Sequence, residues 1–79
     1  MVRKTELFQK NLRYLREAKG FSFRELARES GIPFSTISTI ERGADPNLGT
    51  AQALAVALGK TLDQMVTIDY EAESMRIRR

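Results

Sequence analysis

The segment that most constrains this chain reads GIPFSTISTIERG and runs from Gly31 to Gly43. Glycines at both ends are typical of helix stops, and Pro33 fits a first helical turn, where a backbone N–H is not needed. Ile37 and Ile40 recur at helical spacing and predict a helix with one buried face. The side chains left to face outward are Phe34, Ser35, Ser38 and Thr39.

Two more helices are predicted before this segment. The first covers residues 5–19, ends at Gly20 and has an apolar stripe formed by Phe8, Leu12 and Leu15. Ser22 and Glu25 have the spacing of a capping box, in which each side chain satisfies a free amide at the start of a helix. A second helix is therefore expected from this box to Ser30.

The chain after Gly43 predicts two further helices. The loop ADPNLG leads to a fourth helix, from Thr50 to Gly59, whose apolar face contains Ala51, Leu54, Ala55 and Leu58. A short fifth helix is suggested by Leu62, Met65 and Val66. Five short helices joined by short turns predict an all-α domain over residues 1–66.

The tail, residues 67–79, has a different pattern. Apolar and polar residues alternate in VTIDY and again in MRIR, on either side of EAES. One interpretation is a short β-hairpin, with Asp69 and Glu71 opposite arginines, that serves as a dimerisation strand. The other interpretation is a frayed, disordered terminus.

Composition excludes several function classes. The 79 residues include no cysteine and no histidine, so the commonest general base and the commonest metal ligands are missing. We therefore expect no enzyme, no metal and no cofactor. The chain has no apolar run of about 20 residues and no signal-peptide pattern, which predicts a cytoplasmic protein without a membrane span.

The charge is mildly basic and unevenly distributed. The net charge is +3 and the pI about 9.7. Residues 1–20 contain six basic side chains against two acidic ones, and the rest of the chain is close to neutral. A basic stripe on one helix is typical of phosphate binding, although a solvated helix face has the same composition.

Residues 8–66 resemble the lambda-repressor/Cro family of helix-turn-helix DNA-binding domains, also called the XRE family. The resemblance rests on FQKNLRYLREAKG, FSFRELARESGIPFSTISTIERG and LGTAQALAVALGKTLDQM. Ala27 is the small residue that lets the two helices approach, and Gly31 takes the turn. Apolar residues occupy the remaining family positions, Leu26, Ile32, Ile37 and Ile40.

The resemblance implies that the third helix enters the major groove of DNA. It places Phe34, Ser35, Ser38 and Thr39 at base-contacting positions. It also pairs Arg16, near the end of the first helix, with Glu41. Phosphate-contacting positions are implied for Arg42, Asn47, the amides of Phe23 and Thr50, and Arg16, with Arg13 and Lys10 adding attraction.

The sequence departs from the family at two positions near this face. Phe23 stands where members commonly have glutamine, and Pro33 stands where they usually have a serine or threonine cap. The departures bear on direct readout, because none of the four outward residues makes the bidentate contact of arginine with guanine. Both Phe23 and Phe34 are expected to face outward beside the turn.

The expected function is that of a bacterial or phage transcription regulator, a repressor that binds a palindromic operator as a homodimer. The fifth helix and a strand at MVTIDY are the expected dimer contacts. Two alternatives keep the same fold. One is an antitoxin-like autorepressor that also binds a toxin. The other is a protein-interaction module that uses Phe23 and Phe34.

Overall fold

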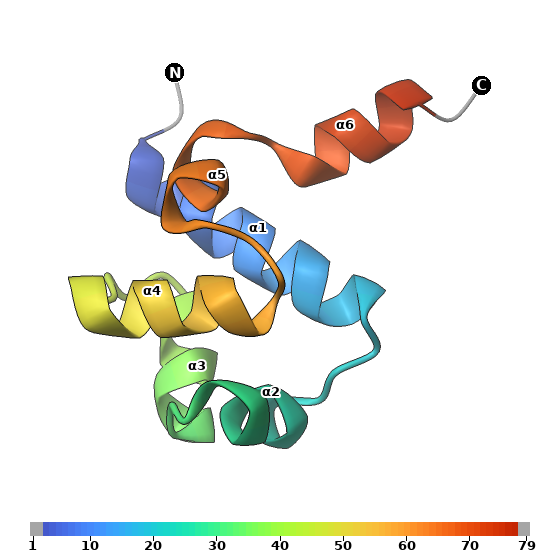
Figure 1. Cartoon of the computed structure of the whole chain (residues 1–79). Coiled ribbons are helices and arrows are strands. Elements are labelled where there is room, and N and C mark those ends of the chain that lie inside the picture. The colour runs from blue at the N-terminus through green and yellow to red at the C-terminus, as the bar shows by residue number, and fades with distance from the viewer. Residues whose placement is uncertain (1–2, 78–79) are drawn as a thin grey trace.

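The computed structural model describes residues 3–77, and this part of the chain is all helical, as the sequence predicts. It contains one helix more than expected. In Figure 1 the long first helix crosses the middle of the molecule, between the second and third helices and the last two. The elements are α1 (Lys4–Ala18), α2 (Phe23–Ser30), α3 (Phe34–Glu41), α4 (Leu48–Ala57), α5 (Leu62–Thr67) and α6 (Tyr70–Ile77).

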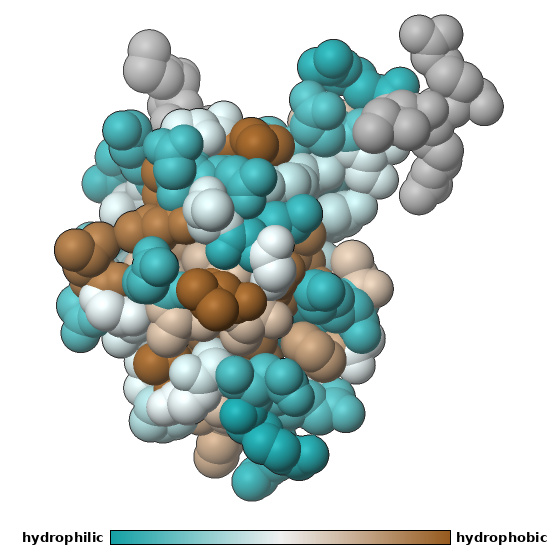
Figure 2. Space-filling model, viewed as in Figure 1, coloured by the Kyte–Doolittle hydropathy of each residue, from teal (hydrophilic) through white to brown (hydrophobic). Residues whose placement is uncertain are grey.

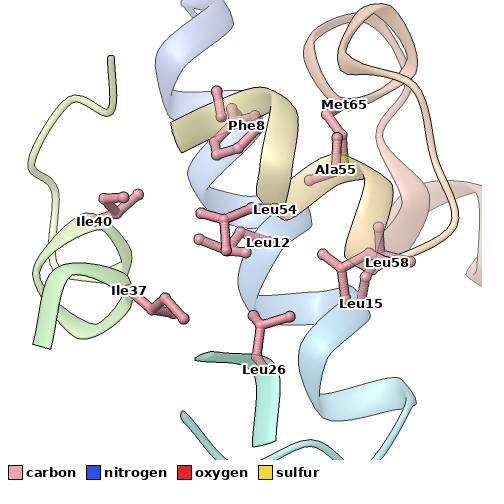
Figure 3. Packing of buried hydrophobic residues seen from close by; sticks show 11 residues of the cluster. Phe8, Leu12, Leu15, Leu26, Ile37, Ile40, Leu54, Ala55, Leu58 and Met65 are labelled. Atoms are coloured by element: carbon pink, nitrogen blue, oxygen red, sulfur yellow. The ribbon is translucent and has the colours of Figure 1, made fainter. Parts of the chain in front are cut away.

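The core forms between α1, α4 and α5 and the α2–α3 pair (Figure 3). The apolar stripe predicted on α1 is its buried face, which confirms that periodicity. Ile37 and Ile40 point from α3 into this core and are almost fully buried. The buried apolar residues are Phe8, Leu12, Leu15, Leu26, Ile37, Ile40, Ala51, Leu54, Ala55, Leu58 and Met65.

Side-chain caps define where α2 and α4 begin. The Ser22–Glu25 capping box is confirmed: the Ser22 amide donates to Glu25 Oε1 at 2.8 Å, and the Glu25 amide donates to Ser22 Oγ at 3.1 Å. Helix α4 begins at Leu48 and not at Thr50, because Asn47 acts as its N-cap and Oδ1 accepts the Thr50 amide at 2.8 Å. Asparagine is among the residues that best fill this position.

The hairpin expected in the tail is wrong, and so is the strand expected at MVTIDY. Helix α5 continues to Thr67, the two residues Ile68 and Asp69 link it to α6, and Ile68 is extended. Asp69 starts α6 by accepting the Ala72 amide at 3.1 Å on its carboxylate. The apolar alternation has another cause, because Val66 and Tyr70 pack on the core from two different helices.

Asn11, a polar residue on the apolar face of α1, holds the junction of α5 and α6. Its side chain is fully buried. Nδ2 donates to the carbonyl of Met65 at 2.9 Å and to that of Ile68 at 2.6 Å, while Oδ1 accepts the Tyr70 amide at 3.1 Å. These backbone groups lie where α5 ends and α6 begins, so one side chain supplies their missing partners.

Asn11→Ala is expected to lower the free energy of unfolding by about 2–4 kcal/mol, because it leaves two carbonyls and one amide without their buried partner. Urea unfolding followed by circular dichroism measures the loss. Gln52→Ala, an exposed change on α4, is the control and is expected to stay within about 0.5 kcal/mol. Equal stability of Asn11→Ala and the wild type would show that Asn11 does not hold this junction.

Candidate nucleic-acid interface

The turn between α2 and α3 sets the direction in which α3 faces. Gly31 caps α2 with a φ of +76°, and its amide donates to the Ala27 carbonyl at 2.8 Å. A side chain at this φ would be strained, so glycine is the residue that permits the sharp turn. Since Ile37 and Ile40 are anchored in the core, the opposite side of α3 is turned to solvent.

The outward side of α3 carries the four residues expected to contact bases. Phe34 is 43% exposed, Ser35 and Thr39 are exposed, and Ser38 is half-buried. The Thr39 hydroxyl donates to the Ser35 carbonyl at 2.8 Å. Its proton is therefore engaged, and Thr39 presents a methyl group and an oxygen that accepts hydrogen bonds.

Shallow hollows border α3 and bring the sequence-predicted residues into groups. One hollow is lined in part by Ser35, Thr39, Asn47 and Thr50. Another is lined by Arg13, Arg16, Phe23, Ser38 and Arg42, together with Glu17 and Glu41. A further hollow, between α2 and α3, contains Phe34 beside Arg24 and Arg28.

Arg16 is bound on several sides. Its Nε donates to Glu41 Oε2 at 2.6 Å and its Nη2 to Glu41 Oε1 at 3.2 Å, while Nη1 donates to the Phe21 carbonyl at 2.7 Å. The side chains of Arg16 and Glu41 are only 13% and 6% exposed. The hydrogen bond with Glu41 is the main cause that raises the pKa of Arg16. This pair joins α1 to the end of α3.

Phe23 does not face outward as expected. Its ring is half-buried and packs against the core, and the Arg16 guanidinium lies over it at 4.3 Å from the ring centroid. The stacked arginine supports the first residue of α2 and covers the ring face. Phe23 is thus less exposed than Phe34, and the Arg16 guanidinium covers one face of its ring.

Two further basic side chains of α1, Arg13 and Lys10, also lie close to carboxylates. Arg13 Nε lies 3.5 Å from Glu17 Oε2, and Lys10 Nζ lies 2.8 Å from Asp69 Oδ2 and 3.8 Å from Glu71. The Lys10 hydrogen bond lowers the pKa of Asp69 and raises that of Lys10. The local excess of positive charge on α1 is thus largely balanced by acidic partners.

A different set of arginines is exposed around α3. Arg24 and Arg28 on α2, and Arg42 at the end of α3, form no ion pair with any other side chain in residues 3–77. The sequence singled out Arg42 but not the other two. Their spacing of four residues on the solvent side of a predicted helix is the signal that would have identified them.

The amino ends of α2 and α4 differ in what they offer an anion. At α4, Asn47 already accepts the Thr50 amide, which leaves the Thr50 hydroxyl and the amides of the first turn. At α2, the Phe23 amide lies next to the cap. Hydrogen bonds from Ser22 lower the pKa of Glu25, so a carboxylate sits beside this helix end. Free amides and the helix dipole favour an anion at both ends, but at α2 the negative charge of Glu25 opposes it.

Residues 3–77 contain neither a metal-site cluster nor a membrane-spanning helix. No cluster of three acidic side chains there has the arrangement of a metal site, and the chain has neither histidine nor cysteine. No helix in this part is both long enough and apolar enough to cross a membrane.

Comparison with known proteins agrees with this geometry. The family model described as Helix-turn-helix matches residues 12–65, which include α2, α3 and α4. The chain belongs to the XRE-type helix-turn-helix family. The family's turn-and-helix unit is the α2–α3 pair whose outward side is described above.

A curated relative is an uncharacterized HTH-type transcriptional regulator, y4dL, of Sinorhizobium fredii. It is 48% identical over 59 residues, which cover 73% of this chain and 30% of the relative. The chain thus spans about a third of the length of the protein it matches. No solved structure matches the chain.

Arg16→Ala is expected to destabilise this helix-turn-helix domain by about 3–5 kcal/mol, because it leaves the Glu41 carboxylate buried without its partner. A domain of this length has only about 4–12 kcal/mol of stability, so the loss is a large fraction of the total. The double variant Arg16→Met/Glu41→Leu, which removes both charges, is expected to regain most of the loss. Urea unfolding measures all three proteins.

Arg13→Ala is the matched control. Its partner Glu17 is exposed, and such surface pairs contribute less than about 1 kcal/mol. If Arg13→Ala and Arg16→Ala cost the same, the buried ion pair is not the joint between α1 and α3.

Proposed function

We propose that this chain binds double-stranded DNA in a sequence-specific way and regulates transcription as a repressor. The observation that carries the proposal is the outward side of α3, whose own exposed residues are uncharged and which is bordered by the exposed arginines Arg24, Arg28 and Arg42. A protein that occupies an operator blocks transcription by its presence alone. Such a regulator acts in the cytoplasm, where bacterial and phage genes are transcribed.

In this proposal α3 lies in the major groove and reads bases with small side chains. Ser35 and Ser38 offer hydroxyl groups that donate or accept. Thr39 accepts a hydrogen bond from an exposed amino group of adenine or cytosine, since its own proton is held by the Ser35 carbonyl. The half-exposed ring of Phe34 meets a thymine methyl group.

Phosphate contacts are proposed on both sides of α3. Arg42 lies at its carboxyl end, and the Phe23 amide lies at the amino end of α2. Asn47 and Thr50 lie at the start of α4 and contact the DNA backbone. They share a hollow with Thr39. Arg13 and Arg16 lie beside Ser38 and add long-range attraction rather than direct grip, because carboxylates pair with both.

A homodimer on a palindromic operator completes the proposal, since one such domain reads only a few base pairs. Helix α4 supports it with Leu48 and Val56, which are 74% and 62% exposed. Figure 2 shows hydrophobic side chains over this helix. Leu48 borders an apolar groove whose other walls include Leu62 and Val66 of α5. Exposed apolar surface of this kind marks protein contacts.

Arg42→Ala is expected to weaken binding to all duplexes alike and to reduce the salt slope of log K by about 1, because it removes one phosphate contact. Ser35→Ala is expected to change the preferred sequence with an unchanged slope. Selection from random duplexes, followed by fluorescence anisotropy across a salt series, measures both.

Arg76→Ala is the matched control: this exposed arginine pairs with Glu73 on α6, on the other side of the molecule, and its loss is expected to leave binding unchanged. A wild-type chain that enriches no sequence and shows a flat salt slope would rule out the proposed function.

Leu48→Glu is expected to weaken the dimer at least about tenfold, because it places a charge at an apolar contact. Sedimentation velocity over a range of concentrations measures the association. Met75→Glu makes the same kind of change at an exposed apolar residue of α6 and is expected to have no effect. A wild-type chain that remains monomeric, both alone and on an operator, contradicts the dimer.

A further inference from the structure

Arg24 and Phe34 form a stacked pair across the helix-turn-helix. The Arg24 guanidinium carbon lies 4.4 Å from the centroid of the Phe34 ring. Arg24 is the second residue of α2 and Phe34 the first of α3, so the pair spans the turn. Both side chains are exposed on the side of the molecule on which α3 is open to solvent.

The neighbouring pair of Arg16 and Phe23 shows what distinguishes this one. Both guanidinium groups lie over a phenylalanine ring. The N–H groups of the Arg16 guanidinium donate to the Glu41 carboxylate and to the Phe21 carbonyl. The N–H groups of the Arg24 guanidinium form no hydrogen bond with any acceptor within residues 3–77. Arg24 therefore has a supported face and an open hydrogen-bonding edge.

We propose that Arg24 and Phe34 together read two consecutive base pairs, with Arg24 binding a guanine and Phe34 the methyl group of a neighbouring thymine. This inference rests on the proposed DNA binding and adds a specificity-determining residue, Arg24, that lies outside α3. It supplies the bidentate contact that Phe34, Ser35, Ser38 and Thr39 cannot make.

The chemistry and the spacing both support this pairing. A guanidinium fork matches O6 and N7 of guanine, and stacking on a ring holds the fork in one plane before DNA arrives. The Arg24 guanidinium carbon and the Phe34 ring centroid are 4.4 Å apart, about 1 Å more than the rise of about 3.4 Å between stacked bases, so the two groups are within reach of neighbouring base pairs. Two stacked side chains can therefore meet two stacked base pairs.

The test uses the full chain and selection from random duplexes, with Arg24→Lys as the main variant. Lysine keeps the charge but lacks the fork. The preference for guanine at one position of each half-site is expected to fall by about 10- to 100-fold, the discrimination of a bidentate contact. The salt slope is expected to stay the same, because the charge is retained.

Phe34→Ala and uracil-containing DNA test the second half of the pair. Replacing the neighbouring thymine by uracil removes its methyl group and is expected to weaken binding of the wild type about two- to fivefold, but not that of Phe34→Ala. Phe34→Ala also removes the platform under Arg24, so its guanine preference is expected to fall as well. Circular dichroism checks that these exposed variants fold.

Arg28→Lys is the matched control, because Arg28 is exposed in the same hollow but does not stack on the ring. It is expected to leave base preferences unchanged. If the wild type selects a site and Arg24→Lys keeps the same guanine preference, Arg24 contacts only phosphate and the inference is wrong, while the proposed function stands. If the wild type selects nothing, both fail.

Discussion

The Arg16 guanidinium is the joint on which the presentation of α3 depends. One planar group from α1 binds the carboxylate that ends α3, the carbonyl that precedes α2 and the ring that begins α2. Since its donors and face are used at once, the α2–α3 unit has one position relative to α1. A buried ion pair contributes little net stability against an apolar replacement, but it penalises arrangements that separate the partners. Its role here is therefore orientation.

This joint also changes which charges face a nucleic acid. Counted along the chain, the positive charge belongs to α1, where Arg13, Arg16 and Lys10 suggest a basic stripe. In the folded molecule each of these lies beside a carboxylate. Within residues 3–77, the exposed arginines that form no ion pair are Arg24, Arg28 and Arg42, on α2 and at the end of α3. Charges without an ionic partner contribute most to the electrostatic potential at the surface. In the folded molecule these unpaired arginines lie on the helix-turn-helix and not on α1.

Local signals predicted the first four helices well. The capping box at Ser22, the glycine at 31 and the apolar stripe on α1 act over a few residues, so they can be read from sequence. The prediction for the tail was wrong because an alternation of three apolar residues fits a strand as well as it fits two helix ends that pack on a core. The junction of the two helices is held by Asn11, which lies more than 50 residues away in the chain.

The candidate site was predictable in part for the same reason. The outward residues of α3 follow from helical spacing around Ile37 and Ile40, and the structure places them on one open face. The pairing of Arg24 with Phe34 joins two helices across a turn, so no local pattern reveals it. Phe23 was misplaced because its partner, Arg16, comes from α1.

The Asn11 contact affects which substitutions helix α6 can accept. Asn11 binds only peptide groups of the α5–α6 junction, and none of the side chains there. The identities of the exposed residues Thr67 and Ala72 are therefore not part of the attachment, whereas Glu71 adds an ion pair with Lys10 of α1. Helix α6 can acquire a new surface by substitution while its position stays the same. The face proposed to bind DNA and the outer surface of α6 thus do not depend on the same side chains.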